Sequence, residues 1–295
     1  MSRLYVDIRN ILNLDISIKS PVKAGAMGRY KSVFKGKGIE FDGFRAYSEN
    51  DDDASLIDWK ASIRANEMLI REFVEERNMN IFFLVDVGST MKFGSGNKLK
   101  GEYAAEVALS LAHVILQSGD SIGFCLFADD AKCKYPFVNG PKQFYIFAES
   151  ITNPRYYNGN FNFKKASDFL FSFARKSDIV FIISDFISMK GNWKDSIEML
   201  AGKYDIIGIM VRDVRDSKMP SKGELVTMED PYANRQVTVN SDAIKKDYED
   251  FTRRQENNVE KAFLKAGRGF IKLYTNQSFI EPVTNFFNMR NRRWR

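Results

Sequence analysis

Residues 80–91 read N-I-F-F-L-V-D-V-G-S-T-M. The apolar run 81–85 leads directly into Asp86 and then into a small polar turn that contains a glycine. A short apolar run that ends in turn residues is typical of a strand buried on both faces. The next segment, 98–117, carries small and aliphatic residues at helical spacing. We therefore expect a strand, a polar turn and a helix, the repeating unit of an open α/β sheet.

The same alternation continues toward the C-terminus and predicts a mostly parallel sheet with helices on both faces. Further buried strands are expected at 178–184, 204–211 and 269–274. The segments 121–127 and 132–138 are expected to pair as a hairpin at one edge of the sheet. The predicted fold class is therefore α/β, with an open and mostly parallel sheet.

Residues 1–78 differ in sequence pattern from the rest of the chain, because short alternating strands and glycine-rich turns replace the long apolar runs. We predict a small β-rich subdomain over 1–78 and an α/β domain over 79–295. A second hairpin, 224–239, interrupts the α/β rhythm and is expected to leave the main sheet and join the 1–78 subdomain. Trp59 could be a recognition residue, but we expect it to be a core anchor of that subdomain.

Composition restricts the class of protein. The chain has 295 residues, of which 44% are hydrophobic, enough to form a sizeable core. No apolar run approaches the roughly 18 residues that a membrane span requires, and the N-terminus lacks the apolar stretch of a signal peptide. We expect a soluble cytoplasmic protein with its two cysteines, Cys125 and Cys133, reduced. A net charge of +6 by itself does not indicate nucleic-acid binding.

Two acidic residues directly succeed buried strands in the predicted sheet: Asp86 and Asp185. Since the carboxyl ends of parallel strands meet at one edge, their side chains are expected to lie together. Two carboxylates at one edge repel each other unless a cation or hydrogen bonds compensate. With the nearby hydroxyls of Ser89, Thr90 and Ser184, they could form an all-oxygen site for a divalent cation such as Mg²⁺. The alternative is that the acids cap the helices after them. Spacing alone leaves both interpretations open.

Two groups of motifs carry a resemblance to known families. The segments D-V-G-S-T-M (86–91) and I-I-S-D-F (182–186) resemble the metal-ion-dependent adhesion site of von Willebrand factor A domains. Upstream, G-R-Y-K-S-V-F-K-G-K-G-I-E-F-D-G-F-R-A-Y (28–47), I-D-W-K-A-S-I-R-A-N (57–66) and I-R-E-F-V-E-E-R (70–77) resemble the large prokaryotic family called domain of unknown function fifty-eight. The resemblance runs from about residue 25 to the C-terminal helix.

This resemblance implies a von Willebrand A-like fold and a partly degenerate metal site. Asp86, Thr90 and Asp185 match the first Asp, the second hydroxyl and the late Asp of the adhesion motif, so they are the predicted Mg²⁺ ligands. Gly88 stands where the first Ser is expected. The loop that usually supplies a Thr reads N-G-N-F-N (158–162), where Phe161 is the closest match and Asn160 or Asn162 could offer an amide oxygen.

The resemblance also implies a function. Members are thought to act with MoxR-type AAA+ ATPases as adaptors in the assembly or maturation of other proteins, so we expect a non-enzymatic adaptor with such a partner. A metal-dependent hydrolase using the same acids is the first alternative, disfavoured because no general base or nucleophile accompanies them. Nucleic-acid binding through the basic end 290–295 is the second. No catalytic residue is predicted, and His113, the single histidine, is expected to pack in a helix.

Overall fold

The computed structural model describes residues 4–8, 11, 35–48, 52–74, 78–220, 225–230 and 235–293. The chain divides into two compact units. The larger unit comprises Met1–Ser20 and Met79–Phe286, and the smaller unit comprises Pro21–Asn78 and Phe287–Arg295. The division places Met1–Ser20 with the α/β part of the chain rather than with the predicted 1–78 subdomain.

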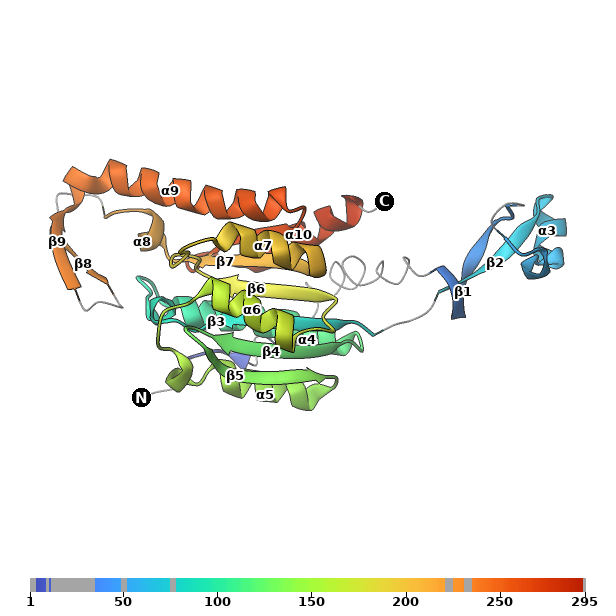
Figure 1. The fold of residues 1–295 in the computed structure, drawn as a ribbon, viewed down its shortest axis with the longest axis horizontal. Coiled ribbons are helices and arrows are strands. Elements are labelled where there is room, and N and C mark those ends of the chain that lie inside the picture. Colours follow the sequence, from blue (N-terminus) through green and yellow to red (C-terminus); the bar gives the residue numbers. More distant parts are fainter. Residues whose placement is uncertain are drawn as a thin grey trace. The chain divides into compact units, whose positions relative to one another are not determined.

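A six-stranded sheet forms the centre of the larger unit (Figure 1). Its strands, in spatial order, are β10 (Gly269–Tyr274), β7 (Asp205–Arg212), β6 (Ile179–Ser184), β3 (Asn80–Asp86), β4 (Ser121–Phe127) and β5 (Ala131–Val138). All neighbours pair in parallel except β4 and β5, which form the expected antiparallel edge hairpin. The predicted α/β class with a mostly parallel sheet is confirmed.

The central strand β3 is buried on both faces, as its continuous apolar run predicts. Successive side chains of a strand point to opposite faces of the sheet. Phe82 accordingly contacts the rings of Phe137 and Phe173, with centroids 5.8 and 6.0 Å away. Phe83 contacts Phe147 and stacks on Phe181, at 5.4 and 5.2 Å. One strand thus contributes aromatic rings to two separate cores.

Helices cover both faces of the sheet (Figure 1). One face carries α6 (Phe163–Phe173), α7 (Trp193–Lys203) and α9 (Ser241–Lys265), and the other carries α4 (Lys100–Gln117), α5 (Pro141–Ile151) and α10 (Ile280–Arg293). The short helix α8 (Val214–Ser217) comes shortly after β7. Among the described residues, no helix is both long enough and apolar enough to cross a membrane.

The second hairpin forms its own two-stranded sheet, made of β8 (Leu225–Asp230) and β9 (Arg235–Asn240). It does not extend the main sheet, and it leads into α9, where the Asn240 side chain accepts a hydrogen bond from the backbone N–H of Asp242. The hairpin belongs to the larger unit. Its expected association with residues 1–78 stays a prediction.

The smaller unit pairs β1 (Lys35–Ala46) with β2 (Leu69–Val74) in an antiparallel ladder. Between them lie a 3₁₀ turn, η3 (Ala54–Leu56), and the helix α3 (Trp59–Ala65). Asp58 caps α3 and forms an ion pair with Arg71 at 2.5 Å. Trp59 is 64% exposed, so the expectation that it anchors a core is wrong. The predicted strand at 14–18 and the glycine-rich turn at 25–32 lie outside the described residues.

The two-sided burial of β3 predicts a large cost for truncating one of its aromatic rings. Phe83→Ala is expected to lower the free energy of unfolding by about 3–5 kcal/mol, because it removes a fully buried ring and leaves a cavity beside Phe147 and Phe181. Urea denaturation monitored by circular dichroism measures the loss. Phe251→Ala is the matched control, since that ring is 71% exposed on α9 and its removal should cost less than about 0.5 kcal/mol. Equal losses for the two variants would contradict the assigned core.

Candidate functional site

Three neighbouring parallel strands, β3, β6 and β7, end at one edge of the sheet, and the loops after them form what we call the rim: residues 87–99, 185–192 and 213–217. Asp86 is the last residue of β3, whereas Asp185 and Asp213 come directly after β6 and β7. All three side chains are buried. The structure therefore brings Asp86 and Asp185 to one edge, as expected, and adds a third strand-end acid.

The Asp86 carboxyl group is held by neighbouring loops. The Ser184 hydroxyl donates to its Oδ2 at 2.6 Å, and the backbone N–H of Gly88 donates to its Oδ1 at 2.7 Å. Ser184 in turn accepts a hydrogen bond from the backbone N–H of Phe186. Asp86 therefore organises the turn after its own strand and joins it to the turn after β6.

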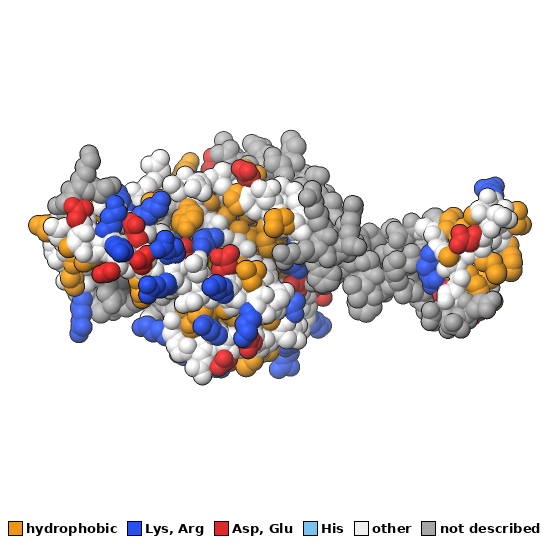
Figure 2. Space-filling model, turned by 90° about the horizontal axis from the view of Figure 1, so that it is seen from above, with side chains coloured by type: hydrophobic (Ala, Val, Ile, Leu, Met, Phe, Trp, Pro, Cys, Tyr) orange, Lys and Arg blue, Asp and Glu red, His pale blue; other side chains and the backbone are white. Residues whose placement is uncertain are grey.

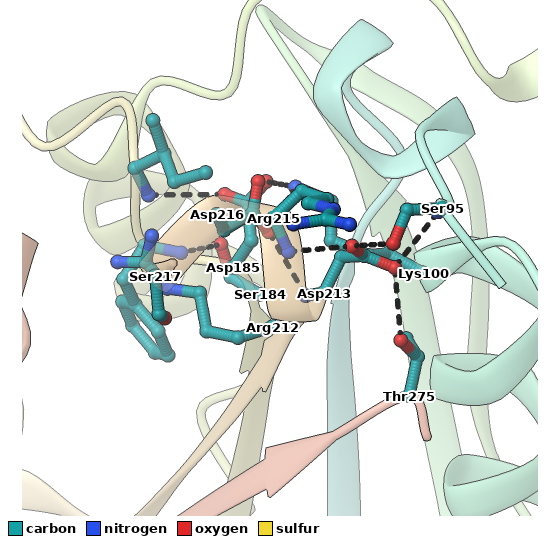
Figure 3. Close-up of polar contacts among 12 residues, drawn as sticks. Ser95, Lys100, Ser184, Asp185, Arg212, Asp213, Arg215, Asp216, Ser217 and Thr275 are labelled. Atoms are coloured by element: carbon teal, nitrogen blue, oxygen red, sulfur yellow. Dashed lines mark hydrogen bonds and ion pairs between the residues drawn. The ribbon is translucent and has the colours of Figure 1, made fainter. Parts of the chain in front are cut away.

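Asp185 has a different partner, the buried ammonium group of Lys100 (Figure 3). The Lys100 Nζ lies 2.8 Å from Asp185 Oδ2 and 2.9 Å from Asp216 Oδ2. The other oxygen of Asp185 accepts from the backbone N–H of Ile187 at 3.0 Å. Lys100 is the first residue of α4, so this contact joins α4 to the loops after β6 and β7.

Asp213 forms a second polar cluster beside the first (Figure 3). Its carboxylate accepts hydrogen bonds from the backbone N–H and hydroxyl of Ser95, from the backbone N–H of Arg215 and from the hydroxyl of Thr275. These donors come from the loop after β3, from α8 and from the turn after β10. The same carboxylate thus caps α8 and fixes three neighbouring segments.

The acids of the rim have pKa values that are shifted in different directions. Burial, together with the nearby charge of Asp185, raises the pKa of Asp86 to about 8. Burial alone would also raise the pKa of Asp185, but the charges of Lys100 and Arg212 outweigh it and hold that pKa below its usual range. Burial raises the pKa of Asp216 despite its contact with Lys100. Burial opposes the charge on Lys100 as well, yet Asp185 and Asp216 outweigh it and raise the pKa of the ammonium group.

The other candidate ligands of the predicted metal site differ in whether their oxygen atoms are free to bind an ion. Thr90 lies in the 3₁₀ turn η4 (Ser89–Lys92) at the rim, and its buried Oγ1 has no hydrogen-bond partner among the described residues. The buried Oδ1 of Asn160 is likewise unpartnered there. Asn162 instead caps α6 by accepting from the backbone N–H of Lys165. Phe161 packs its ring into the core and is 3% exposed, so its side chain takes no part in the rim.

As arranged, these residues do not fit the predicted Mg²⁺ role well. The two unpartnered oxygens, Thr90 Oγ1 and Asn160 Oδ1, would suit a cation. However, Asp185 already binds an ammonium group, and a divalent ion on the same carboxylate would be repelled by it. Gly88 contributes no ligand, and a Cβ added there would lie 3.0 Å from Asp86 Oδ1. In the part of the chain that the structure describes, no group of three or more His, Cys, Asp or Glu side chains is arranged to hold a metal. The Mg²⁺ site at Asp86, Thr90 and Asp185 stays a prediction.

Sequence reasoning missed three members of this polar network: Lys100, Asp213 and Asp216. Asp213 carried a usable signal, because it succeeds the third buried strand just as Asp185 succeeds the second. Asp216 and Lys100 carried none, since a lysine or aspartate near a helix start usually faces solvent.

The chain matches the family model described as "Protein of unknown function DUF58" over residues 43–258. An uncharacterized protein of Mycobacterium tuberculosis is 22% identical over 282 residues, which cover 95% of this chain and 88% of that protein. The uncharacterized protein YeaD of Bacillus subtilis is 30% identical over 100 residues, or 34% of this chain and 23% of that protein.

Solved structures resemble the chain in fold. A conserved hypothetical protein, BatB from Bacteroides thetaiotaomicron, covers 73% of this chain with its whole length, at a TM-score of 0.50 and 13% identity. The SpRpn10 VWA domain covers 46% of this chain with 76% of its own, at a TM-score of 0.36 and 10% identity. At 13% identity the likeness to BatB concerns the fold alone.

The raised pKa of Asp86 predicts a pH-dependent stability. Between about pH 4 and about pH 8 the folded chain retains a proton that the unfolded chain has lost, so this group makes the protein less stable as the pH rises. Asp86→Asn removes the titration, and its thermal stability should fall less than that of the wild type between about pH 5 and about pH 8. Differential scanning calorimetry in a buffer with chelator measures both profiles.

The control for this pH experiment is Asp168→Asn, which changes an exposed carboxylate that pairs with Lys164 on α6. This variant is expected to keep the wild-type pH profile. An Asp86→Asn profile parallel to that of the wild type would show that Asp86 does not retain the extra proton.

Proposed function

The chain belongs to the DUF58 family of proteins of unknown function, and from this premise we propose that it is a non-enzymatic adaptor that binds another protein through the rim. The exposed apolar side chains of Phe93 and Ile187 carry the proposal. They lie on the loops after β3 and β6, and they are 44% and 39% exposed. Large apolar side chains exposed on the loops of one sheet edge are typical of protein-binding surfaces.

The buried polar contacts of the rim support this role because they hold the presenting loops in place. Phe93 precedes Ser95, whose backbone and hydroxyl both bind Asp213. The backbone N–H of Ile187 itself donates to Asp185. A docking surface whose loops are fixed in advance loses less conformational entropy on binding than a mobile one.

A MoxR-type AAA+ ATPase is the proposed partner, and assembly or maturation of other proteins is the proposed process. The support is the resemblance carried by the motifs at 28–47, 57–66 and 70–77. A cytoplasmic location is proposed with it.

The non-enzymatic character of the proposal is supported by the state of the strand-end acids. Asp86, Asp185 and Asp213 each accept hydrogen bonds or ion pairs from neighbouring groups, and all three are buried. Groups so engaged hold the loops together, whereas a general base needs access to its substrate. Figure 2 shows basic and acidic side chains interspersed over the face of the larger unit that it draws. The nucleic-acid alternative concerns the basic end 290–295 and stays an alternative.

The proposal predicts that removing the apolar side chains of the rim weakens docking. Binding of the purified chain to the MoxR-type AAA+ ATPase from the same genome is measured by biolayer interferometry. The double variant Phe93→Ala/Ile187→Ala is expected to bind at least about tenfold more weakly than the wild type, because two large apolar contacts would be lost from one surface.

Tyr145→Ala is the matched control, since Tyr145 is 59% exposed on α5, outside the rim, and its removal should leave the affinity unchanged. Wild-type affinity in the double variant would exclude the rim as the docking surface. A wild-type chain that does not bind the ATPase at all would exclude this partner.

A further inference from the structure

Lys100 occupies a position that is unfavourable for a positive charge on two grounds. Its side chain is 1% exposed, and burying an unpaired ammonium group costs several kcal/mol. It is also the first residue of the 18-residue helix α4, where the helix dipole favours negative charge. A lysine at such a site persists only if nearby anions compensate both costs.

The compensation comes from two loops that succeed separate strands. Asp185 comes directly after β6 and Asp216 lies in α8 after β7, and both carboxylates contact the Lys100 ammonium within 2.9 Å. A single positive centre therefore joins the start of α4 to two strand-end loops (Figure 3). This is the structural task that a bound divalent ion would perform at the same edge: to neutralise clustered carboxylates and to tie their loops together.

We propose that the Lys100 ammonium is the resident cation of the rim and stands in place of a divalent ion, so that the chain folds and docks without Mg²⁺. Three observations on separate residues agree with this. The ammonium engages Asp185, a predicted metal ligand. Gly88 lacks the hydroxyl that the adhesion motif supplies, and a side chain there would crowd Asp86. Phe161 stands closest to the position where the adhesion motif usually supplies a Thr, and its ring lies in the core, so it offers no oxygen ligand.

An ammonium group and a metal ion differ in how a partner could be recognised. A bound metal ion can keep an open coordination position that a partner carboxylate completes. The Lys100 ammonium is buried and already paired with two carboxylates, so it offers no such position. A partner is therefore recognised by the exposed surface of the rim, including Phe93 and Ile187, and an acidic residue of the partner is not required. This mode of recognition rests on the proposed docking function; the cation role of Lys100 does not.

Thermal unfolding of the full chain in chelator, Mg²⁺ and Mn²⁺ tests the cation role. The wild-type melting temperature should be the same in all three buffers. Lys100→Met leaves the carboxylates of Asp185 and Asp216 buried without their ammonium, so its melting temperature should fall by on the order of 10 °C in chelator. Mg²⁺ or Mn²⁺ should recover part of that loss, because a divalent ion can then approach Asp185.

Lys164→Met is the matched control, because Lys164 pairs with Asp168 on α6 and both side chains are more than half exposed. It should change the melting temperature little and should show no metal response. The double variant Lys100→Met/Asp185→Asn removes one of the two uncompensated carboxylates together with the ammonium. This double variant should be more stable than Lys100→Met, and its melting temperature should not respond to metal. If Lys100→Met fails to fold, the double variant still provides a folded protein for the test.

Four outcomes would overturn the cation role of Lys100. The first is stoichiometric Mn²⁺ binding by the wild type, seen by electron paramagnetic resonance and lost in Asp86→Asn. The second is a Lys100→Met variant as stable as Lys164→Met, and the third is a folded Lys100→Met variant that no divalent ion stabilises. Wild-type docking that is lost in chelator would also contradict it while leaving the docking function intact. Conversely, failure of the wild type to dock would leave the melting results on Lys100 unaffected.

Discussion

The structure of the rim depends on one constraint: parallel strands place their carboxyl ends, and the residues just after them, at the same edge of the sheet. Here that edge gathers Asp86, Asp185, Asp213 and Asp216, against the basic side chains of Lys100 and Arg212. Acids outnumber bases in a region with little water, where repulsion between charges is strong. That repulsion is relieved by the proton that Asp86 retains up to about pH 8, by hydrogen bonds to Asp213 and by the ammonium group between Asp185 and Asp216.

The relief of this repulsion also fixes the loops themselves. Each carboxylate accepts from groups that are distant in sequence, as Asp213 does from Ser95 and Thr275. Such contacts connect the turns after β3, β7 and β10. Each of these turns is therefore held in a single conformation. The aromatic and aliphatic side chains that these loops expose are then held above a rigid, buried polar layer. A surface of this kind suits binding to another protein better than it suits proton transfer, because its titratable groups are sequestered from solvent.

A tethered ammonium and a divalent ion would neutralise the same acids, but they differ in whether a partner can bind to the cation directly. The ammonium is covalently attached, carries one charge and has its donors already engaged, whereas a metal ion can exchange ligands with a partner. In the roles proposed for this chain, the cation therefore contributes to the fold, and recognition falls to the outer surface of the rim. Two buried oxygens, Thr90 Oγ1 and Asn160 Oδ1, keep no partner among the described residues, and they lie in the two segments where the adhesion motif of the resemblance has its hydroxyl ligands.

The sequence by itself determined the elements and the acids at their ends. Apolar runs such as 81–85 and 179–183 are local signals, and a run that ends in Asp86 or Asp185 places that residue at the strand end regardless of its surroundings. The smaller unit was predicted less well, because the exposure of Trp59 depends on neighbours that the local pattern does not specify.

Only the tertiary structure decided which charges meet. A lysine at the start of a helix is expected to face solvent, and nothing in the residues around Lys100 indicates that it is buried. Its partner Asp185 is 85 positions away in the chain, so their contact exists only once β3 and β6 pair and α4 packs across them. The identity of the cation at the rim is therefore a property of the packed sheet, because the balance between burial and pairing of charges is set by neighbours in space.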